Sequence, residues 1–272
     1  MNPFDLSVTA FLAWYVPFGA AVCAAMYWVS RWSEPTLPAG QVPTDPCTIA
    51  CLRAGPAEAV RVAALALLER GALELAARDN LSVCSLVQPP PTVSPVESVV
   101  YEHFNKGGDA RSLFTDKQLE ALVRGHTEPT LEAAQLIPDE SLRDVRRHHL
   151  YCALVLLMGL AAPALLAALS REAADLELLV SVAYVYCRIA YAISQRPRTP
   201  AGHRAVRFLE QTFHPMRERL QDSAEPRSQD VSMVAAVFGL TALPKVAHAQ
   251  ITALHPITDS ECEGGGWGDG GD

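Results

Sequence analysis

The sequence predicts a mainly α-helical membrane protein with about three transmembrane helices and a small, winged-helix-like soluble domain. Half of its 272 residues are hydrophobic and only 19% are charged, which is more apolar than a typical soluble chain. Three apolar runs have the length and low charge of membrane helices. The expected segments are a first transmembrane helix (8–30), a linker (31–44), a cytosolic helical domain (45–149), a second transmembrane helix (150–169), a third transmembrane helix (178–195), a cytosolic polar segment with a short apolar helix (196–255) and a disordered glycine-rich tail (256–272).

The first apolar run, residues 11–29, contains no charged residue. At about 1.5 Å per residue it is close to the length that crosses about 30 Å of hydrocarbon. Tryptophan and tyrosine residues lie towards both of its ends, where such rings prefer the headgroup level. The preceding residues include Asp5 and no lysine or arginine, unlike the basic start of an export signal. We therefore expect a retained membrane anchor rather than a cleaved signal peptide.

After the proline-containing linker, capping residues predict a pair of helices. Asp45 is a good N-cap with Pro46 at the first helical position, and Gly55 suits the end of that helix. Pro56 then begins a second helix, which Gly71 ends. Apolar residues recur on one face of the second helix, as in a half-buried helix.

Two short strands are expected next, at residues 72–76 and 81–86, with Asp79 and Asn80 as turn formers. The order helix, helix, hairpin is winged-helix-like. Three further short helices are expected at 96–104, 116–124 and 130–136, with Gly125 and Pro129 as breaks.

The charge balance argues against nucleic acid as a partner. The whole chain has a formal net charge of −8, whereas binding to phosphates requires a surplus of lysine and arginine. The helix–helix–hairpin region is itself slightly acidic, without a basic face or a basic wing. We expect a protein-contact module rather than a DNA reader.

The second and third apolar runs predict a hairpin through the membrane. Residues 150–169 carry no charge, and Pro163 is expected to kink this span rather than end it. The run 178–193 is shorter and contains Arg188, which we interpret as an anchor that snorkels to the interface rather than an ion or substrate site. The alternative for this third run is an amphipathic helix lying on the membrane.

Charges flanking the hairpin predict its orientation. Arginines and histidines precede the second run and arginines follow the third, whereas the connector 170–177 holds one arginine against three acidic residues. The positive-inside rule then places the main soluble domain in the cytosol and the amino terminus outside. Beyond the hairpin, residues 217–230 are expected to be polar and loosely ordered. The apolar stretch 231–243 is too short to cross and should dock on the membrane or on the domain.

Candidate metal ligands are few: His148, His149 and Cys152 at the start of the second span. His148 and Cys152 share a helix face because they are four residues apart. A catalytic zinc needs three protein ligands, and interfacial histidines are common at such positions. Cys47 and Cys51 are also four residues apart. This spacing is consistent with a redox pair or with two small buried side chains. No catalytic residues and no cofactor are predicted.

Several motifs together resemble a family of uncharacterised bacterial membrane proteins with an amino-terminal membrane segment, a paired-helix cytosolic motif and a glycine-rich carboxyl tail. The residues concerned are 52–56 (Leu-Arg-Ala-Gly-Pro), 64–71 (Ala-Leu-Ala-Leu-Leu-Glu-Arg-Gly), 196–202 (Arg-Pro-Arg-Thr-Pro-Ala-Gly) and the closing glycines. The tail departs from the family pattern in having Cys262 alone. The resemblance implies a bacterial inner membrane and no particular activity.

The sequence leaves two classes of function open and favours the first of them. The first is a membrane-tethered protein-interaction module whose partners are the lipid bilayer and an unidentified protein. The alternative is a metal-dependent or redox membrane enzyme that uses His148 and Cys152.

Overall fold

The computed structural model describes residues 8–33, 42–76, 80–83, 94–106, 116–170, 176–222 and 228–243, and these residues form two compact units. Unit 1 contains the long helices α1 (Val8–Ser33), α6 (Glu140–Ser170) and α7 (Leu176–Ser194). Most of the predicted linker and the whole glycine-rich tail lie outside the described residues. The described residues are mainly helical, and three of their helices are apolar and long enough to cross a membrane, which confirms this part of the expected fold class.

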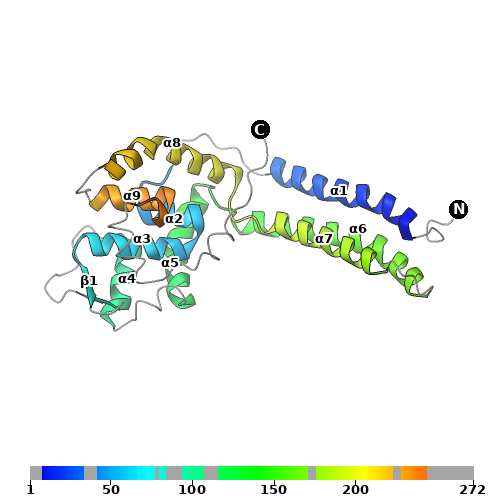
Figure 1. Ribbon diagram of the computed structural model, residues 1–272, viewed down its shortest axis with the longest axis horizontal. Coiled ribbons are helices and arrows are strands. Elements are labelled where there is room, and N and C mark those ends of the chain that lie inside the picture. The colour runs from blue at the N-terminus through cyan, green and yellow to red at the C-terminus, as the bar shows by residue number, and fades with distance from the viewer. Residues whose placement is uncertain are drawn as a thin grey trace. The chain divides into compact units, whose positions relative to one another are not determined.

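The three helices of unit 1 pack alongside one another (Figure 1). Phe11 near the start of α1 clusters with Ala161 of α6 and Leu179 of α7. Met26 near the end of α1 clusters instead with Leu150 and Ala190. Helix α1 therefore runs antiparallel to α6 and parallel to α7.

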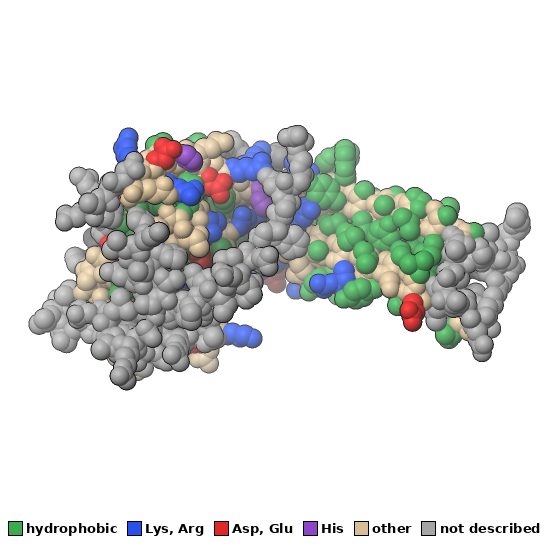
Figure 2. All heavy atoms as spheres, in the orientation of Figure 1, with side chains coloured by type: hydrophobic (Ala, Val, Ile, Leu, Met, Phe, Trp, Pro, Cys, Tyr) green, Lys and Arg blue, Asp and Glu red, His purple; other side chains and the backbone are tan. Residues whose placement is uncertain are grey.

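The outward surface of this bundle is apolar. The stretches that could span a membrane are Ala10–Trp32, Glu140–Leu166 and Glu177–Ser194. Figure 2 shows hydrophobic side chains over much of the visible face of these helices. Val155 is 71% exposed and Leu166 is 69% exposed. A soluble protein rarely leaves a contiguous apolar surface open to water, so the bundle is suited to a lipid environment.

Two tyrosine hydroxyls of the bundle donate hydrogen bonds to backbone carbonyl groups of a neighbouring helix. The Tyr186 hydroxyl donates to the carbonyl oxygen of Val16 at 2.8 Å, and the Tyr15 hydroxyl donates to that of Leu157 at 3.3 Å. Gly19 allows the Tyr186 ring to approach α1, because a Cβ atom there would lie 2.8 Å from a ring carbon. The close approach of α1 and α7 thus depends on this glycine.

Unit 2 is a helical unit with a small hairpin and its own apolar core. Its elements are α2 (Pro46–Ala54), α3 (Pro56–Glu69), β1 (Leu73–Ala76), β2 (Asn80–Val83), α4 (Pro95–Asn105), α5 (Lys117–Ala133), α9 (Ser228–Phe238) and the 3₁₀ turn η3 (Leu240–Ala242). Helix α8 (Pro200–Asp222) begins in unit 1 and continues in unit 2.

The predicted caps of α2 and α3 are confirmed. The Asp45 side chain accepts a hydrogen bond from the Thr48 amide at 2.9 Å, and Pro46 occupies the first helical position. Gly55 separates the two helices with a φ of 96°, a conformation that favours glycine. Gly71 follows α3 with a φ of 70°.

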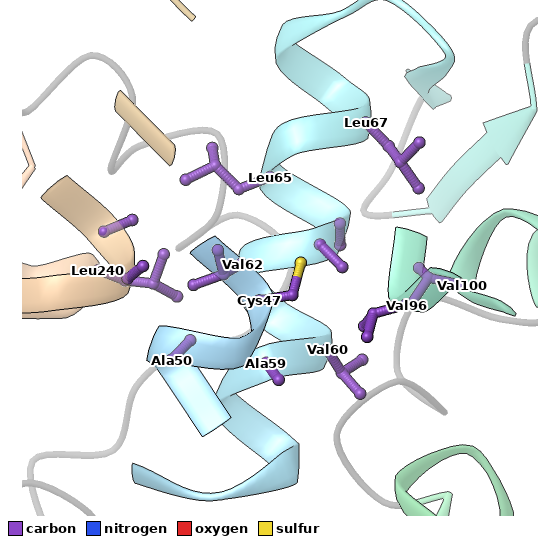
Figure 3. Packing of buried hydrophobic residues seen from close by; sticks show 14 of the residues in the cluster. Cys47, Ala50, Ala59, Val60, Val62, Leu65, Leu67, Val96, Val100 and Leu240 are labelled. Atoms are coloured by element: carbon purple, nitrogen blue, oxygen red, sulfur yellow. The ribbon is translucent and has the colours of Figure 1, made fainter. Parts of the chain in front are cut away.

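The core of unit 2 surrounds α3. Figure 3 shows Val60, Val62 and Leu65 of α3 among side chains of α2, α4 and the η3 turn. Helix α9 completes this core, since Val231 and Val234 are fully buried in the same cluster. The short apolar stretch 231–243 thus docks on the domain.

The hairpin pairs antiparallel, with Leu73 opposite Val83 and Ala76 opposite Asn80. Asn80 therefore lies in β2 rather than in the turn, so its predicted position as a turn former was wrong. The rest of the predicted second strand, residues 84–86, lies outside the described residues.

The predicted break within residues 116–136 was wrong. Helix α5 runs without interruption through Gly125 and Pro129. Proline in a helix loses the hydrogen bond to the residue four positions earlier, at a cost of about 3 kcal/mol. Four side chains at a spacing of four residues are buried along α5 and offset this cost: Leu119, Val123, Thr127 and Leu131.

The expectation of loose order at 217–230 was also wrong at both ends of this stretch, because α8 extends to Asp222 and α9 begins at Ser228. Helix α8 has an inner face on the unit 2 core, with Leu209 and Leu220 buried and Phe213 and Met216 partly buried. Their spacing of four, three and four residues is that of an amphipathic helix. The Arg217 guanidinium also lies over the Phe238 ring, 5.1 Å from its centroid.

We predict that Val234→Ala lowers the free energy of unfolding of unit 2 by about 2 kcal/mol, because two buried methyl groups are lost. The measurement is urea unfolding of the detergent-solubilised full chain, followed by pulse proteolysis. Leu122→Ala is the control, since Leu122 is exposed and should change the value by less than about 0.5 kcal/mol. A loss for Val234→Ala as small as the control would contradict the burial of α9.

Candidate functional site

The structure brings His148 and Cys152 together and places His149 elsewhere. Nε2 of His148 lies 3.7 Å from Sγ of Cys152, and both side chains are exposed on α6. His149 is half-buried, and its Nδ1 atom is fully buried without a hydrogen-bond partner. Adjacent helical residues point about 100° apart, which explains why only one of the two histidines joins the cysteine.

A complete metal site is not formed by the described part of one chain. No group of three or more histidine, cysteine, aspartate or glutamate side chains with suitable geometry occurs among the described residues. Two ligands leave a catalytic zinc one ligand short. The pair is therefore a partial site within a single chain.

A cluster of polar contacts lies at the end of unit 1 where α6 begins and α7 ends. Arg146 is only 4% exposed, and its guanidinium donates to the carbonyl oxygen of Arg196 at 2.6 Å. The Arg196 guanidinium in turn lies over the Tyr27 ring, 4.5 Å from its centroid. A cation over an aromatic face is favourable, so this cluster connects all three helices of the bundle.

Thr199 connects the two loops on this side of unit 1. Its hydroxyl is directed to the carbonyl oxygens of Gln135 at 2.8 Å and Leu136 at 3.0 Å, and it accepts from the Gly202 amide at 3.1 Å. The Thr199 amide also donates to Leu136 at 3.2 Å. Thr199 is fully buried and acts as the N-cap of α8. Gln135 has a positive φ of 55°, which turns the chain after α5 towards this contact.

Arg188 is exposed on α7, and its guanidinium lies 5.9 Å from the centroid of the Tyr191 ring. Because Arg188 lies near the end of α7 that is followed by arginines, its side chain can reach the interface from there. Its interpretation as an anchor stays a prediction.

The two cysteines of α2 differ in environment. Cys47 is fully buried, and its burial, together with the nearby carboxylates of Asp45 and Glu97, raises the pKa of its thiol. Sγ of Cys51 lies 3.2 Å from the Thr127 hydroxyl, and burial raises its pKa as well. Both cysteines are free thiols. Raised pKa values disfavour the reactive thiolate, which favours a packing role over a redox role for the buried Cys47 and the half-buried Cys51.

Sequence reasoning did not identify Arg146 or Thr199. Thr199 directly precedes Pro200, which is a recognisable start signal for a helix. The burial of Arg146 depends on a carbonyl group fifty positions further along the chain, and no local pattern indicates such a contact.

Comparisons of the chain with protein-family models, with curated proteins and with solved structures gave no significant match. The resemblance to the family of bacterial membrane proteins therefore stays a prediction.

We predict that Thr199→Val lowers stability by about 1–3 kcal/mol, because it removes the N-cap of α8 and leaves the buried Gly202 amide without its acceptor. Thermal unfolding of the full chain in detergent measures this. Thr212→Val is the matched control, since the Thr212 hydroxyl only bonds back to Phe208 on the exposed side of α8. Equal effects of the two substitutions would contradict a connecting role for Thr199.

Proposed function

We propose that this protein is a membrane-tethered interaction module: α1, α6 and α7 hold it in the bilayer, and unit 2 binds a protein partner at the membrane surface. The observation that carries the proposal is the contrast between the two units. Unit 1 directs large apolar side chains outwards, whereas unit 2 encloses its apolar side chains around α3.

The dimensions of the helices support insertion. Helix α6 has 31 residues, or about 46 Å at about 1.5 Å per residue, and the candidate span in α7 has 18 residues, or about 27 Å. Both lengths are compatible with a hydrocarbon layer of about 30 Å if α6 extends beyond it. Helices satisfy their own backbone hydrogen bonds, which a lipid environment requires.

The chain path supports a hairpin that crosses twice. Helix α9, which follows α7, is buried in the same core as α2 and α3, which precede α6. Both parts of unit 2 must therefore lie on one side of the membrane. If α6 crosses, α7 has to return the chain, which disfavours the alternative of α7 lying on the surface.

The arginines around the start of α6 and the end of α7 assign that side to the cytosol by the positive-inside rule. The membrane is then a bacterial inner membrane, and the amino terminus lies on its outer side. The winged-helix-like character of unit 2 is part of the same proposal, supported by the order α2, α3, β1, β2.

A protein partner is favoured over nucleic acid because the arginines of α2 and α3 are already paired. Arg53 contacts Glu58 at 2.6 Å, and Arg70 at the end of α3 contacts Glu97 at 2.6 Å. Arg61 contacts Glu58 as well, at 3.3 Å. Guanidinium groups held by carboxylates are not available to neutralise phosphates.

The second candidate, a metal-dependent or redox membrane enzyme, is favoured by one observation, the 3.7 Å approach of His148 and Cys152. It requires further ligands and a general base. We therefore place it second.

The partner is tested with photo-crosslinking residues at Leu122 on α5 and Phe208 on α8, which are large exposed apolar side chains of unit 2. We expect one of them to give a discrete adduct with the same protein that co-purifies in mild detergent. Leu122→Asp or Phe208→Asp, whichever residue crosslinks, should weaken that co-purification at least about tenfold, as for a residue central to an interface.

Gln118→Asp is the matched control for α5, because it adds the same charge at an exposed position one turn away. A crosslinker at Tyr184, which is exposed on α7, should not give this adduct. Absence of an adduct at both unit 2 positions, or equal loss of co-purification for Gln118→Asp, would contradict the proposed interface.

A further inference from the structure

One stripe on α6 is exposed along the length of the apolar span. Its residues follow one another in alternating steps of four and three: His148, Cys152, Val155, Gly159, Ala162 and Leu166. All six are exposed, so neither α1 nor α7 covers them. This spacing is the heptad seam through which two helices pack against each other.

The middle of the stripe is built for close approach. A Cβ atom at Gly159 would meet nothing within 4 Å, so the glycine is not required by packing inside the bundle. Gly19, by contrast, is needed for contact with Tyr186. Small residues on a lipid-facing helix let a second helix come near enough for extensive contact, and Gly159 and Ala162 provide this together.

The first two residues of the stripe, His148 and Cys152, form half of a metal site. In tetrahedral zinc sites the Zn–N distance is about 2.0–2.1 Å and the Zn–S distance about 2.3 Å, which separates the two ligand atoms by about 3.6 Å. His148 Nε2 and Cys152 Sγ are 3.7 Å apart. Their present arrangement therefore matches the bite of one ion, with two of the four ligands that a structural zinc takes.

We propose that two copies of this chain pack in parallel through the α6 stripe, and that His148 and Cys152 of both copies bind one Zn²⁺ ion. A twofold axis along the seam brings the two half-sites together and supplies the missing ligands. Each Cys152 binds as the thiolate, so two protons are released to solvent for each ion.

The charges of this site balance, since two thiolates neutralise the ion. This matters at the edge of an apolar span, where an unbalanced charge is costly. The nearby cation Arg147 lies 3.6 Å from Asp144 of the same helix, so a carboxylate offsets it one turn before His148. The inference does not depend on the partner-binding role of unit 2.

The test uses the full chain in mild detergent, stripped with a chelator and then supplied with Zn²⁺ alone. We expect about one tightly bound Zn²⁺ per two chains, and a dimer by light scattering that the chelator reverts towards monomer. Replacement by Co²⁺ should give the absorption bands of a tetrahedral site with thiolate ligands. One ion per chain in a monomer, or no tight binding, would overturn the proposal.

Substitutions separate the metal from the seam. His148→Ala and Cys152→Ser should each abolish tight binding, whereas Cys187→Ser, on α7, should retain it. Gly159→Trp should reduce dimer formation at least about tenfold, and Val185→Trp, at an exposed position of α7, should not. These positions are outside the core clusters, so each variant should fold. Unchanged thermal unfolding would confirm this. Equal behaviour of Gly159→Trp and Val185→Trp would overturn the seam.

Discussion

The burial of α9 against α2 and α3 is the constraint on which the rest of the structure depends. Val234 and Ala235 are fully buried there, and Arg53 of α2 donates from Nε to the carbonyl oxygen of Ala236 at 3.0 Å. These residues come from opposite sides of the α6–α7 hairpin in sequence. Unit 2 can therefore fold only if the chain returns to the point from which it entered unit 1.

The contacts at the base of the bundle are consistent with this return. Thr199 joins the loop after α7 to the loop before α6, and Arg146 of α6 bonds the carbonyl group of Arg196 after α7. Hydrogen bonds to buried groups are expensive to leave unmade. The two chain segments that flank the hairpin, before α6 and after α7, are thus held beside each other by specific hydrogen bonds within unit 1.

Local chemistry made much of the fold predictable. Asp45, Pro46 and Gly55 define α2 because capping and proline geometry act within a few residues. The long apolar helices α1, α6 and α7 were predictable from sequence runs with little or no charge. Gly125 and Pro129 misled the prediction because buried contacts along α5 outweigh the intrinsic cost of a proline.

In the candidate site, too, contacts between residues close in sequence were predictable and contacts between distant residues were not. The approach of His148 and Cys152 follows from helix geometry, so spacing predicted it. The different orientation of His149 also follows from that geometry. The sequence had grouped it with His148 and Cys152 because all three are side chains that can bind metal ions. Arg146 and Arg196 meet across fifty positions of sequence, and only the packing of α6 against α7 brings them together.

The hairpin topology is tested most directly by determining on which side of the membrane the segments before and after the hairpin lie. Ala110→Cys and Ser223→Cys would be treated with a membrane-impermeant maleimide in sealed vesicles of both orientations, with the unsubstituted chain as background for the native thiols. We expect both positions to be labelled from the same side, the cytoplasmic one. Labelling of Ala110→Cys and Ser223→Cys from opposite sides would contradict it, because α9 could not then reach the core of unit 2.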